Sequence, residues 1–267
     1  MANLKIYCVT NIASQKLEML NLTLASVGKN KFPDNYIDCK SGNTIEFKEK
    51  HYSELTFHYW FWKNKLAEFN ENIWIGFCQK RRFWLKNTNS NINNLEDLNN
   101  NILREVPSDW ENFDAILCNP IAVSPAKKIK IIKRGWKNIL KDPGVFFNKK
   151  KQTIKLHFDM HHGYGILDKA IDVMNINDRE EFRDYVNKKL EFSPHIMFIS
   201  KKKIINNWFE NLFKWLFECE RIFGLDNLHG YDQARLYAYL SERYLPFWFE
   251  KHYKIKFCPW TFFDTEV

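Results

Sequence analysis

Two adjacent arginines, Arg81 and Arg82, are well suited to bind an anion, because they follow the short apolar segment from Ile73 to Cys78. That segment is too short for a helix and too apolar for a loop, so it predicts a buried strand of a parallel or mixed sheet. Ligands of open α/β sheets bind beyond the carboxyl ends of the strands. Guanidinium groups match the geometry of phosphate and carboxylate oxygens. The pair therefore predicts an anion site at a sheet edge.

The polar and aromatic segment HYSELTFHYWFWKN, which begins at His51, predicts a helix before this strand. Ser53 is the expected N-cap, and Glu54 suits the positive end of the helix dipole. Steps of four and three predict a buried face made of Leu55, Tyr59, Trp62, Leu66 and Phe69. Four side chains then face elsewhere: Glu54, Trp60, Lys63 and Asn64. Among them, Lys63 is a further candidate for binding phosphate, and the other three are candidate substrate contacts.

Length and composition indicate one globular domain, residues 1–267. Hydrophobic residues make up 45% of the chain and aromatic residues 16%, which excludes global disorder. The net charge of +8 favours an acidic partner, such as a nucleotide diphosphate, nucleic acid or an anionic membrane.

Because no long apolar run or signal-peptide segment is present, we expect a cytoplasmic protein. The six cysteines show no metal-binding spacing, which favours reduced thiols in the core.

Other segments predict the elements that position these side chains. Leu4 to Thr10 predicts a first strand, which would place Thr10 and Asn11 near the ligand edge. Further strands are expected at 114–119 and 195–200, and helices at 178–190 and 201–223. The C-terminal helices together cover 201–252. Eight asparagines among residues 87–101 favour an exposed surface loop.

A basic stretch, residues 127–155, carries eleven Lys or Arg. It suits a nucleic-acid groove only if Trp136, Phe146 and Phe147 supply stacking surfaces. It also suits a patch that faces anionic membrane lipid, where each cation contributes roughly 1 kcal/mol. A solvated cationic face is the third interpretation, and it is the one that the sequence favours.

Two further segments carry groups capable of acid and base chemistry. If HFDMHHGYG is extended, His157, Asp159 and His161 project to one side as a metal or acid/base cluster, or as substrate contacts. Near the start of the last helix, Asp232 and Gln233 occupy the first turn, where side chains can project into a cleft. In the same helix we expect Pro246 to bend or end a segment, and Glu242 and Arg243 to form a structural ion pair.

Four of these motifs, in order, resemble a bacterial family. They are HYSELTFHYWFWKN, IGFCQKRRFW, SPHIMFISKK and YDQARLYAYLSERYLPFWF. The resemblance is to the capsular and exopolysaccharide glycosyltransferases long classed as a domain of unknown function, which include galactofuranosyltransferases. This chain departs from the family where Gln79 and Lys80 replace a His-Tyr pair, and where Ile196 replaces Asn. A family histidine that precedes a helix corresponds to His161 or His162, and His195 lies within the third motif.

The resemblance implies a fold, a reaction and partners. The fold would be α/β, with a single mixed, mostly parallel sheet flanked by helices, a nucleotide-sugar-binding (GT-A-like) architecture and a helical C-terminal part. The reaction would move a sugar, such as galactofuranose, from a nucleotide-diphosphate donor, a UDP-sugar by expectation, to a growing polysaccharide or lipid-linked glycan. With such an acceptor we expect peripheral contact with the inner membrane face.

Such a transfer needs groups that neutralise the leaving diphosphate and, for inversion, a base for the acceptor hydroxyl. Arg81 and Arg82 suit the first task, and Asp232, then Asp159, are the candidates for the second. We expect no divalent metal cofactor, because no Asp-x-Asp turn follows a predicted strand; Asp264-Thr265-Glu266 is a related string near the chain end. The rival interpretation is a non-catalytic protein that binds nucleic acid or another polyanion.

Overall fold

The computed structural model describes residues 3–88, 90–123 and 128–266, with the side chains of 128–130 and 231 left out. The chain forms two compact units. Unit 1 comprises residues 1–119, 195–211 and 249–267, and unit 2 comprises residues 120–194 and 212–248. That the two form one domain stays a prediction.

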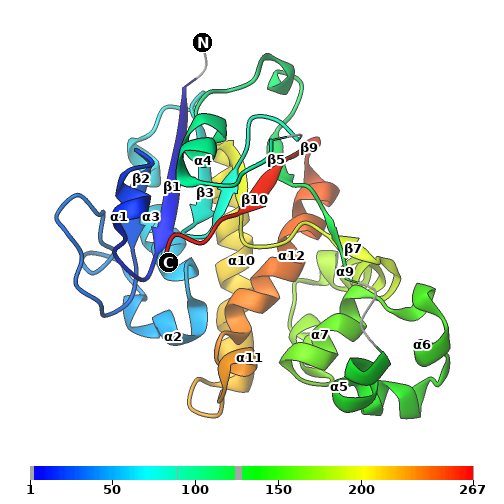
Figure 1. The fold of residues 1–267 in the computed structure, drawn as a ribbon. Helices are drawn as coiled ribbons and strands as arrows, with labels where there is room; N and C mark the ends of the chain where they lie inside the picture. Colours follow the sequence, from blue (N-terminus) through cyan, green and yellow to red (C-terminus); the bar gives the residue numbers. More distant parts are fainter. Residues whose placement is uncertain (1–2, 89, 124–127, 267) are drawn as a thin grey trace. The chain divides into compact units, whose positions relative to one another are not determined.

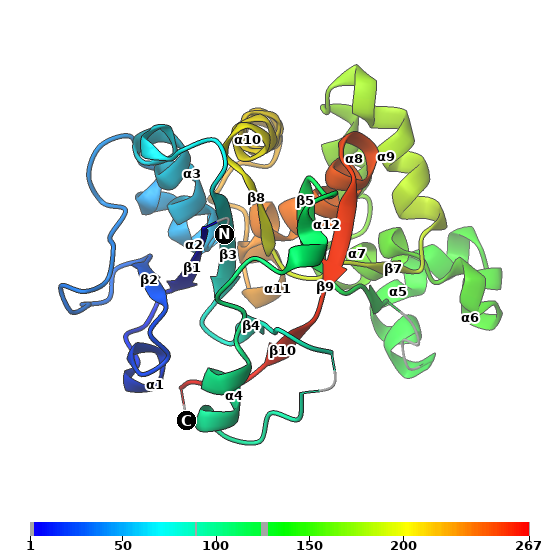
Figure 2. The same ribbon diagram turned by 90° about the horizontal axis from the view of Figure 1, so that it is seen from above.

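Unit 1 contains a mixed sheet, which is eight-stranded over the described residues. Its strands are β1 (Leu4–Thr10), β2 (Thr23–Ser26), β3 (Trp74–Gln79), β4 (Arg82–Trp84), β5 (Ala115–Cys118), β8 (Phe198–Lys201), β9 (Ile255–Cys258) and β10 (Trp260–Phe262). The predicted strands at 4–10, 73–78, 114–119 and 195–200 are confirmed within a few residues. β1 lies between β2 and β3, and β3 is followed across the sheet by β8, β5 and β9 (Figure 2).

Most strands of this sheet point the same way. The pairings of β1 with β2 and β3, and of β5 with β9, are parallel, whereas β8 is antiparallel to both β3 and β5. In the hairpin at the edge, β4 is antiparallel to β3 and to β10. Only β4 and β8 are therefore reversed among the described strands, and the predicted mixed, mostly parallel sheet is confirmed. The amino end of β8 consequently lies at the edge where β1 and β3 end.

Alternating side chains divide the core of unit 1 between the two faces of the sheet. On one face, Ile6, Cys8 and Ile199 belong to an apolar cluster that includes Leu98 of α4. On that face Gly76 is required, since a Cβ atom there would lie 2.7 Å from Cγ1 of Ile199. The opposite face packs under α3 and α10 (Figure 2) through aromatic pairs. They are Tyr7 with Phe61 at 4.9 Å, His58 with Phe77 at 4.3 Å and Phe77 with Phe209 at 5.9 Å.

The helices of unit 1 are α1 (Gln15–Glu18), α2 (Glu49–Tyr52), α3 (Leu55–Asn64) and α4 (Leu95–Asn101). The predicted N-cap Ser53 is wrong: it separates α2 from α3 with a φ of +53°, and its carbonyl accepts hydrogen bonds from Thr56. The predicted buried face is also partly wrong. Tyr59 and Trp62 are half-buried, whereas Phe57, His58 and Phe61 are fully buried, because α3 meets the aromatic face of the sheet.

The asparagine-rich segment is not wholly a loop, because its second half forms α4. Asn94 caps this helix by accepting a hydrogen bond from the amide of Asp97 at 2.8 Å. Asparagine is a preferred N-cap residue, so the composition that suggested a turn also starts a helix. Leu98 anchors α4 in the core.

Helices dominate unit 2, several of which are drawn in green in Figure 1. They are α5 (Lys128–Lys141), α6 (Gly144–Phe147), α7 (Ile154–His162), α8 (Ile166–Asp172), α9 (Ile176–Lys188) and α11 (Tyr231–Ala234). A two-stranded ribbon joins β6 (Ile121–Ala122) to β7 (Glu191–Phe192), so the expected single sheet has a small companion. Lys127, at the start of the basic stretch, lies outside the described residues. The predicted helix at 178–190 corresponds to α9.

The two longest helices run through both units. They are α10 (Lys202–Phe223) and α12 (Leu236–His252). The predicted inward row of α10 is confirmed, since Ile204, Trp208, Leu212, Trp215 and Cys219 are all buried. The helix α12 continues through Pro246 and does not end there. Glu242 and Arg243 form the predicted ion pair, with Arg243 almost fully buried.

All six cysteines are free and buried, as predicted for reduced thiols. Burial raises the pKa of Cys39 and of Cys258 to about 12, so both stay protonated at neutral pH. No helix within the described residues is long and apolar enough to cross a membrane.

The buried imidazole of His58 makes the stability of unit 1 depend on pH. Burial lowers its pKa to about 3, and its Nδ1 has no hydrogen-bond partner among the described residues. In the unfolded chain His58 binds a proton near pH 6.5, whereas in the folded chain it stays neutral down to about pH 3. The free energy of unfolding therefore falls as the pH falls from 6.5 toward 3. The loss amounts to about 1.4 kcal/mol per pH unit for one such group.

We therefore expect His58→Phe to reduce the loss of unfolding free energy between pH 7 and pH 5 by about 2 kcal/mol. Urea unfolding at the two pH values measures it. Phe57→Leu provides the control, because it alters the same buried face without removing a titratable group and should keep the pH dependence of the parent. An unaltered pH slope in His58→Phe would contradict this account of the core.

Candidate functional site

One edge of the sheet in unit 1 gathers most of the residues predicted to bind the donor. Val9 pairs with Gln79 in the parallel register of β1 and β3, so the two strands end side by side. His195 precedes the reversed strand β8 and reaches the same edge, with a φ of +65°. We call this group the carboxyl-edge cluster: Thr10, Asn11, Gln79, Lys80, Arg81, Arg82 and His195.

Hydrogen bonds fix several members of the carboxyl-edge cluster. Lys80 Nζ donates to Asn11 Oδ1 at 2.8 Å, and Arg82 Nε donates to His195 Nε2 at 3.0 Å. The second bond requires that His195 carry its proton on Nδ1. Thr10 is buried, and its hydroxyl donates to the carbonyl of Ile12 at 2.6 Å. The cluster therefore presents three consecutive cations on a hydrogen-bonded frame.

Two carboxylates balance this charge. Glu266 Oε1 lies 2.6 Å from Lys80 Nζ and 3.7 Å from Arg81 Nε, and Asp264 Oδ2 lies 4.0 Å from Arg81 Nη1. Between them, Thr265 is anchored by a bond from its hydroxyl to the Lys80 carbonyl at 2.6 Å. We call residues 264–266 the acidic segment. The acidic segment follows β10 in the chain. Its contacts with Lys80 and Arg81 were not predicted from the sequence, and an anion that binds at these cations must compete with it.

The helix α3 separates the other predicted residues of the central motif. Glu54, at its start, accepts a hydrogen bond from Gln79 Nε2 and so adjoins the carboxyl-edge cluster. Lys63 lies nine residues further along, about 14 Å by helical rise, with its ammonium over the Trp62 ring. Trp60 and Asn64 hold the turn at residues 41–43 through bonds to Ser41 and Asn43. The structure thus gives Trp60 and Asn64 structural contacts, and it does not bring Lys63 to Arg81 and Arg82.

A second group of predicted residues meets within unit 2. Arg134 Nη1 lies 3.2 Å from Asp232 Oδ2 and 3.1 Å from His161 Nδ1. Asp232 is half-exposed, and Gln233 follows it in α11. These four side chains, together with Met160, His229 and Gly230, line an open depression of about 370 Å³. We call it the α7–α11 depression, and it is large enough to receive a sugar ring.

The neighbouring residues of α7 are mostly buried. HFDMHH is helical, so the predicted extended arrangement of His157, Asp159 and His161 is wrong. Asp159 faces away from the two histidines, with Lys155 Nζ at 2.8 Å and the Gly165 amide at 3.1 Å. Burial raises the pKa of Asp159, an effect that Lys155 opposes. These contacts favour a structural role for Asp159.

Two histidines of α7 are held neutral. Burial, reinforced by the charge of Arg243, lowers the pKa of His157 to about 3 and that of His162 to about 4. His162 stacks on Tyr239 with ring centroids 3.8 Å apart, and its Nδ1 donates to the Asp232 carbonyl at 2.9 Å. His162 therefore positions the backbone of Asp232. No group of three or more potential metal ligands occurs among the described residues.

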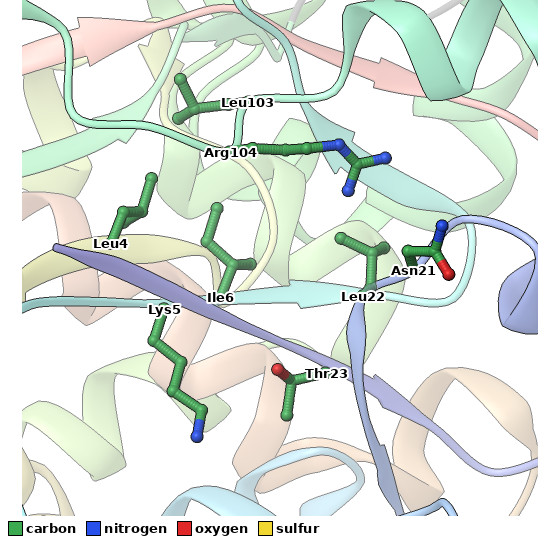
Figure 3. A pocket seen from close by; sticks show the side chains of 8 residues that line it. All are labelled: Leu4, Lys5, Ile6, Asn21, Leu22, Thr23, Leu103 and Arg104. Atoms are coloured by element: carbon green, nitrogen blue, oxygen red, sulfur yellow. The ribbon is translucent and has the colours of Figure 1, made fainter.

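Unit 1 also contains a further cavity (Figure 3). It is lined near the start of β1 by Leu4, Lys5, Ile6, Asn21, Leu22, Thr23, Leu103 and Arg104. Its volume of about 170 Å³ is below the range typical of ligand pockets. The guanidinium of Arg104 donates to Leu20 O at 2.9 Å and to Asn99 Oδ1 at 2.6 Å, so this cavity is part of the framework.

Comparison with known proteins identifies the family of this chain and a protein of similar fold. A family model described as a domain of unknown function, DUF4422, matches residues 5–253. The chain belongs to the DUF4422 family. Its fold resembles that of WbbM, a bifunctional glycosyltransferase solved in its apo form, with a TM-score of 0.69 and 18% sequence identity. The match covers 97% of this DUF4422 chain and 45% of the WbbM chain, so this chain spans less than half of that protein. No curated protein matches the sequence.

The predicted membership of a family classed as a domain of unknown function is thus confirmed, and so is the likeness of this chain's fold to that of a glycosyltransferase. Sequence analysis missed two residues of the candidate sites in this DUF4422 chain. Lys80 was treated as a departure from a motif, although its position beside Arg81 could have indicated a third cation. Arg134 was hidden within the basic stretch, and no spacing in the sequence links it to Asp232.

If the acidic segment competes with bound anions, its removal should strengthen anion binding. We expect Asp264→Asn with Glu266→Gln to bind inorganic pyrophosphate more tightly, by about twofold to thirtyfold, since each of the two carboxylates takes part in an ion pair worth roughly 0.2–1 kcal/mol. Calorimetric titration at low salt measures this. Asp226→Asn with Glu210→Gln makes the same change of charge at exposed positions and should leave the affinity unaltered. Equal affinities in the two double variants would show that the acidic segment does not compete.

Proposed function

We propose that this DUF4422 chain is a glycosyltransferase whose unit 1 holds the diphosphate of a nucleotide-sugar donor at the carboxyl-edge cluster. The observation that carries the proposal is the run of three cations from Lys80 to Arg82, held beside the end of β1 by Asn11. The likeness of the fold to a glycosyltransferase supports it, and so does the position at the carboxyl ends of parallel strands, where α/β sheets bind ligands.

The cluster suits a leaving diphosphate on chemical grounds. Transfer of the sugar leaves negative charge on the diphosphate, and cations fixed in advance stabilise that charge without reorganising during the reaction. Arg82 is fixed by His195 on one side and lies over the Phe262 ring at 5.4 Å. Lys80 and Arg81 are held by the acidic segment, which a diphosphate would displace as the stronger partner.

We propose Asp232 as the base that takes the proton from the acceptor hydroxyl. Its carboxylate is half-exposed in the α7–α11 depression, and Arg134 and the backbone bond from His162 limit its movement. Asp159 is the weaker candidate, because its side chain is fully buried against Lys155. His161 and Gln233 line the same depression and are proposed acceptor contacts.

The remaining assignments rest on the family resemblance. They are a UDP-sugar donor, galactofuranose as the sugar, and a capsular, exopolysaccharide or lipid-linked glycan as the acceptor at the inner membrane face. The proposal includes no divalent cofactor, since the three cations can neutralise a diphosphate by themselves, and transfer measured with EDTA present tests this.

The donor site is tested by titrating UDP into variants of the arginine pair. We expect Arg81→Ala and Arg82→Ala each to weaken UDP binding by about tenfold to a hundredfold, the effect of losing a charged hydrogen bond. Arg221→Ala is the control, because Arg221 is exposed and pairs only with Glu218 of its own helix among the described residues. Full UDP affinity in both variants of the pair would remove them from the donor site.

The base is tested separately, by transfer measured with a donor found by screening. We expect Asp232→Asn to lower the transfer rate by at least about a hundredfold, as loss of a general base does, and to leave UDP affinity unchanged. Asp226→Asn removes a neighbouring exposed carboxylate and should retain full activity. A fully active Asp232→Asn variant would exclude this residue as the base.

A further inference from the structure

Four large apolar side chains of unit 2 are exposed on α5 and α6. Ile132 is 53% exposed, Trp136 51%, Leu140 74% and Phe147 79%. α5 has a kink with non-helical backbone at Gly135, so Ile132 lies before the kink and Trp136 and Leu140 lie one helical turn apart after it. We call these four residues the apolar row.

The sequence of α5 explains why this row is exposed. Ile131, Gly135 and Ile139 face the packed side of α5, and each residue of the apolar row on α5 directly follows one of them. Ile131 is fully buried and packs with Val145, Leu156 and Met160. At Gly135 a Cβ atom would lie 3.2 Å from Met160 Cγ, so this side of α5 is in close contact with α7. Ile131 and Gly135 thus make the contacts of α5 with the rest of unit 2, and the side chains of the apolar row are not needed for this packing.

Cations lie beside the apolar row. Lys133, Lys137 and Lys141 each follow one of its members on α5 and are exposed. Lys149, Lys150 and Lys151 follow Phe147 and are also exposed. In the part of the chain that the structure describes, Lys151 pairs with Asp142 at 2.6 Å, and the other five have no carboxylate within 4.0 Å. The apolar row is thus bordered by positive charge that is largely unbalanced.

We propose that this face of unit 2 binds an anionic lipid surface, with the apolar row inserted among the acyl chains and the lysines against the headgroups. Interfacial helices have this construction, in which apolar burial and attraction to anionic lipid act together. A nucleic acid would use the cations and the Trp136 ring, but it offers no apolar environment for Ile132 and Leu140. The stacking groups expected of a nucleic-acid groove are also incomplete, because Phe146 is partly buried against the cluster beneath α5.

The size of the effect follows from the two contributions. Each lysine near an anionic surface strengthens binding about fivefold, so three together contribute on the order of a hundredfold. That contribution decreases with salt, because the attraction is screened over about 10 Å at 0.1 M ionic strength. The apolar contribution is independent of salt, so the two can be separated.

The experiment uses the full chain and two kinds of vesicle. Neutral vesicles contain phosphatidylcholine alone, and anionic vesicles also contain about one third phosphatidylglycerol, whose negative charge attracts lysines. We expect binding to the anionic vesicles and little to the neutral ones. Two triple variants should each weaken it at least about tenfold. One replaces the apolar residues, as Trp136→Ser, Leu140→Ser and Phe147→Ser, and the other replaces the cations, as Lys133→Gln, Lys137→Gln and Lys141→Gln.

Matched controls separate these effects from general loss of charge or apolar surface. Phe47→Ser with Ile176→Ser removes two apolar side chains that are 72% and 70% exposed elsewhere. Lys40→Gln, Lys203→Gln and Lys214→Gln remove three exposed cations from other positions. Both controls should bind vesicles like the parent. Insertion itself is read from quenching of tryptophan fluorescence by bromine-labelled acyl chains, part of which should disappear in Trp136→Phe.

Three outcomes would overturn the proposal. The apolar variant could bind like the parent, which would leave only a solvated cationic face. Quenching could be unchanged in Trp136→Phe, which would place the ring outside the bilayer. Single-stranded nucleic acid could displace the vesicles and bind the apolar variant as tightly as the parent, which would assign the face to nucleic acid. Because no sugar donor is present, failure here is distinct from failure of the proposed transferase activity.

Discussion

The parallel pairing of β1 with β3 is the constraint on which the candidate donor site depends. Its register brings the ends of two strands together, so that Asn11 after one strand can contact Lys80 after the other. A parallel pair needs a crossover between its strands, and here α2 and α3 belong to that crossover and cover one face of the sheet. The same helices place Glu54 beside Gln79. A shift of register would separate these side chains and remove the cluster.

The three consecutive cations Lys80, Arg81 and Arg82 repel one another, and neighbouring side chains reduce this repulsion. Glu266 contacts both Lys80 and Arg81, and His195 Nε2 accepts a hydrogen bond from Arg82 Nε. The acidic segment therefore stabilises Lys80 and Arg81 in the way that an anionic ligand would. Binding of a diphosphate then exchanges one set of anionic oxygens for another, which lets the site favour a doubly charged group over a single carboxylate.

The sequence predicted the main elements because their patterns are local. Strands such as Leu4–Thr10 are continuous apolar runs, and the inward row of α10 follows the helical period. It misplaced the buried face of α3, because α3 ends at Asn64, before the last two predicted residues, and packs His58 and Phe61 on the aromatic face of the sheet. It also treated HFDMHH as extended, although Thr153 caps a helix there. Contacts between distant segments, such as Arg134 with Asp232 or Glu266 with Lys80, leave no periodic signal and required the structure.

Binding of a nucleotide-sugar diphosphate by unit 1 can be measured by a thermal-shift screen of nucleotide sugars at low salt. We expect a particular nucleotide sugar to stabilise the protein saturably, by about 2.7 kcal/mol at a hundred times its dissociation constant. We also expect UDP to compete with this ligand. If no member of the panel stabilises the protein, and DNA or RNA binds tightly with a steep salt dependence, unit 1 does not bind such a donor and the protein binds polyanions instead.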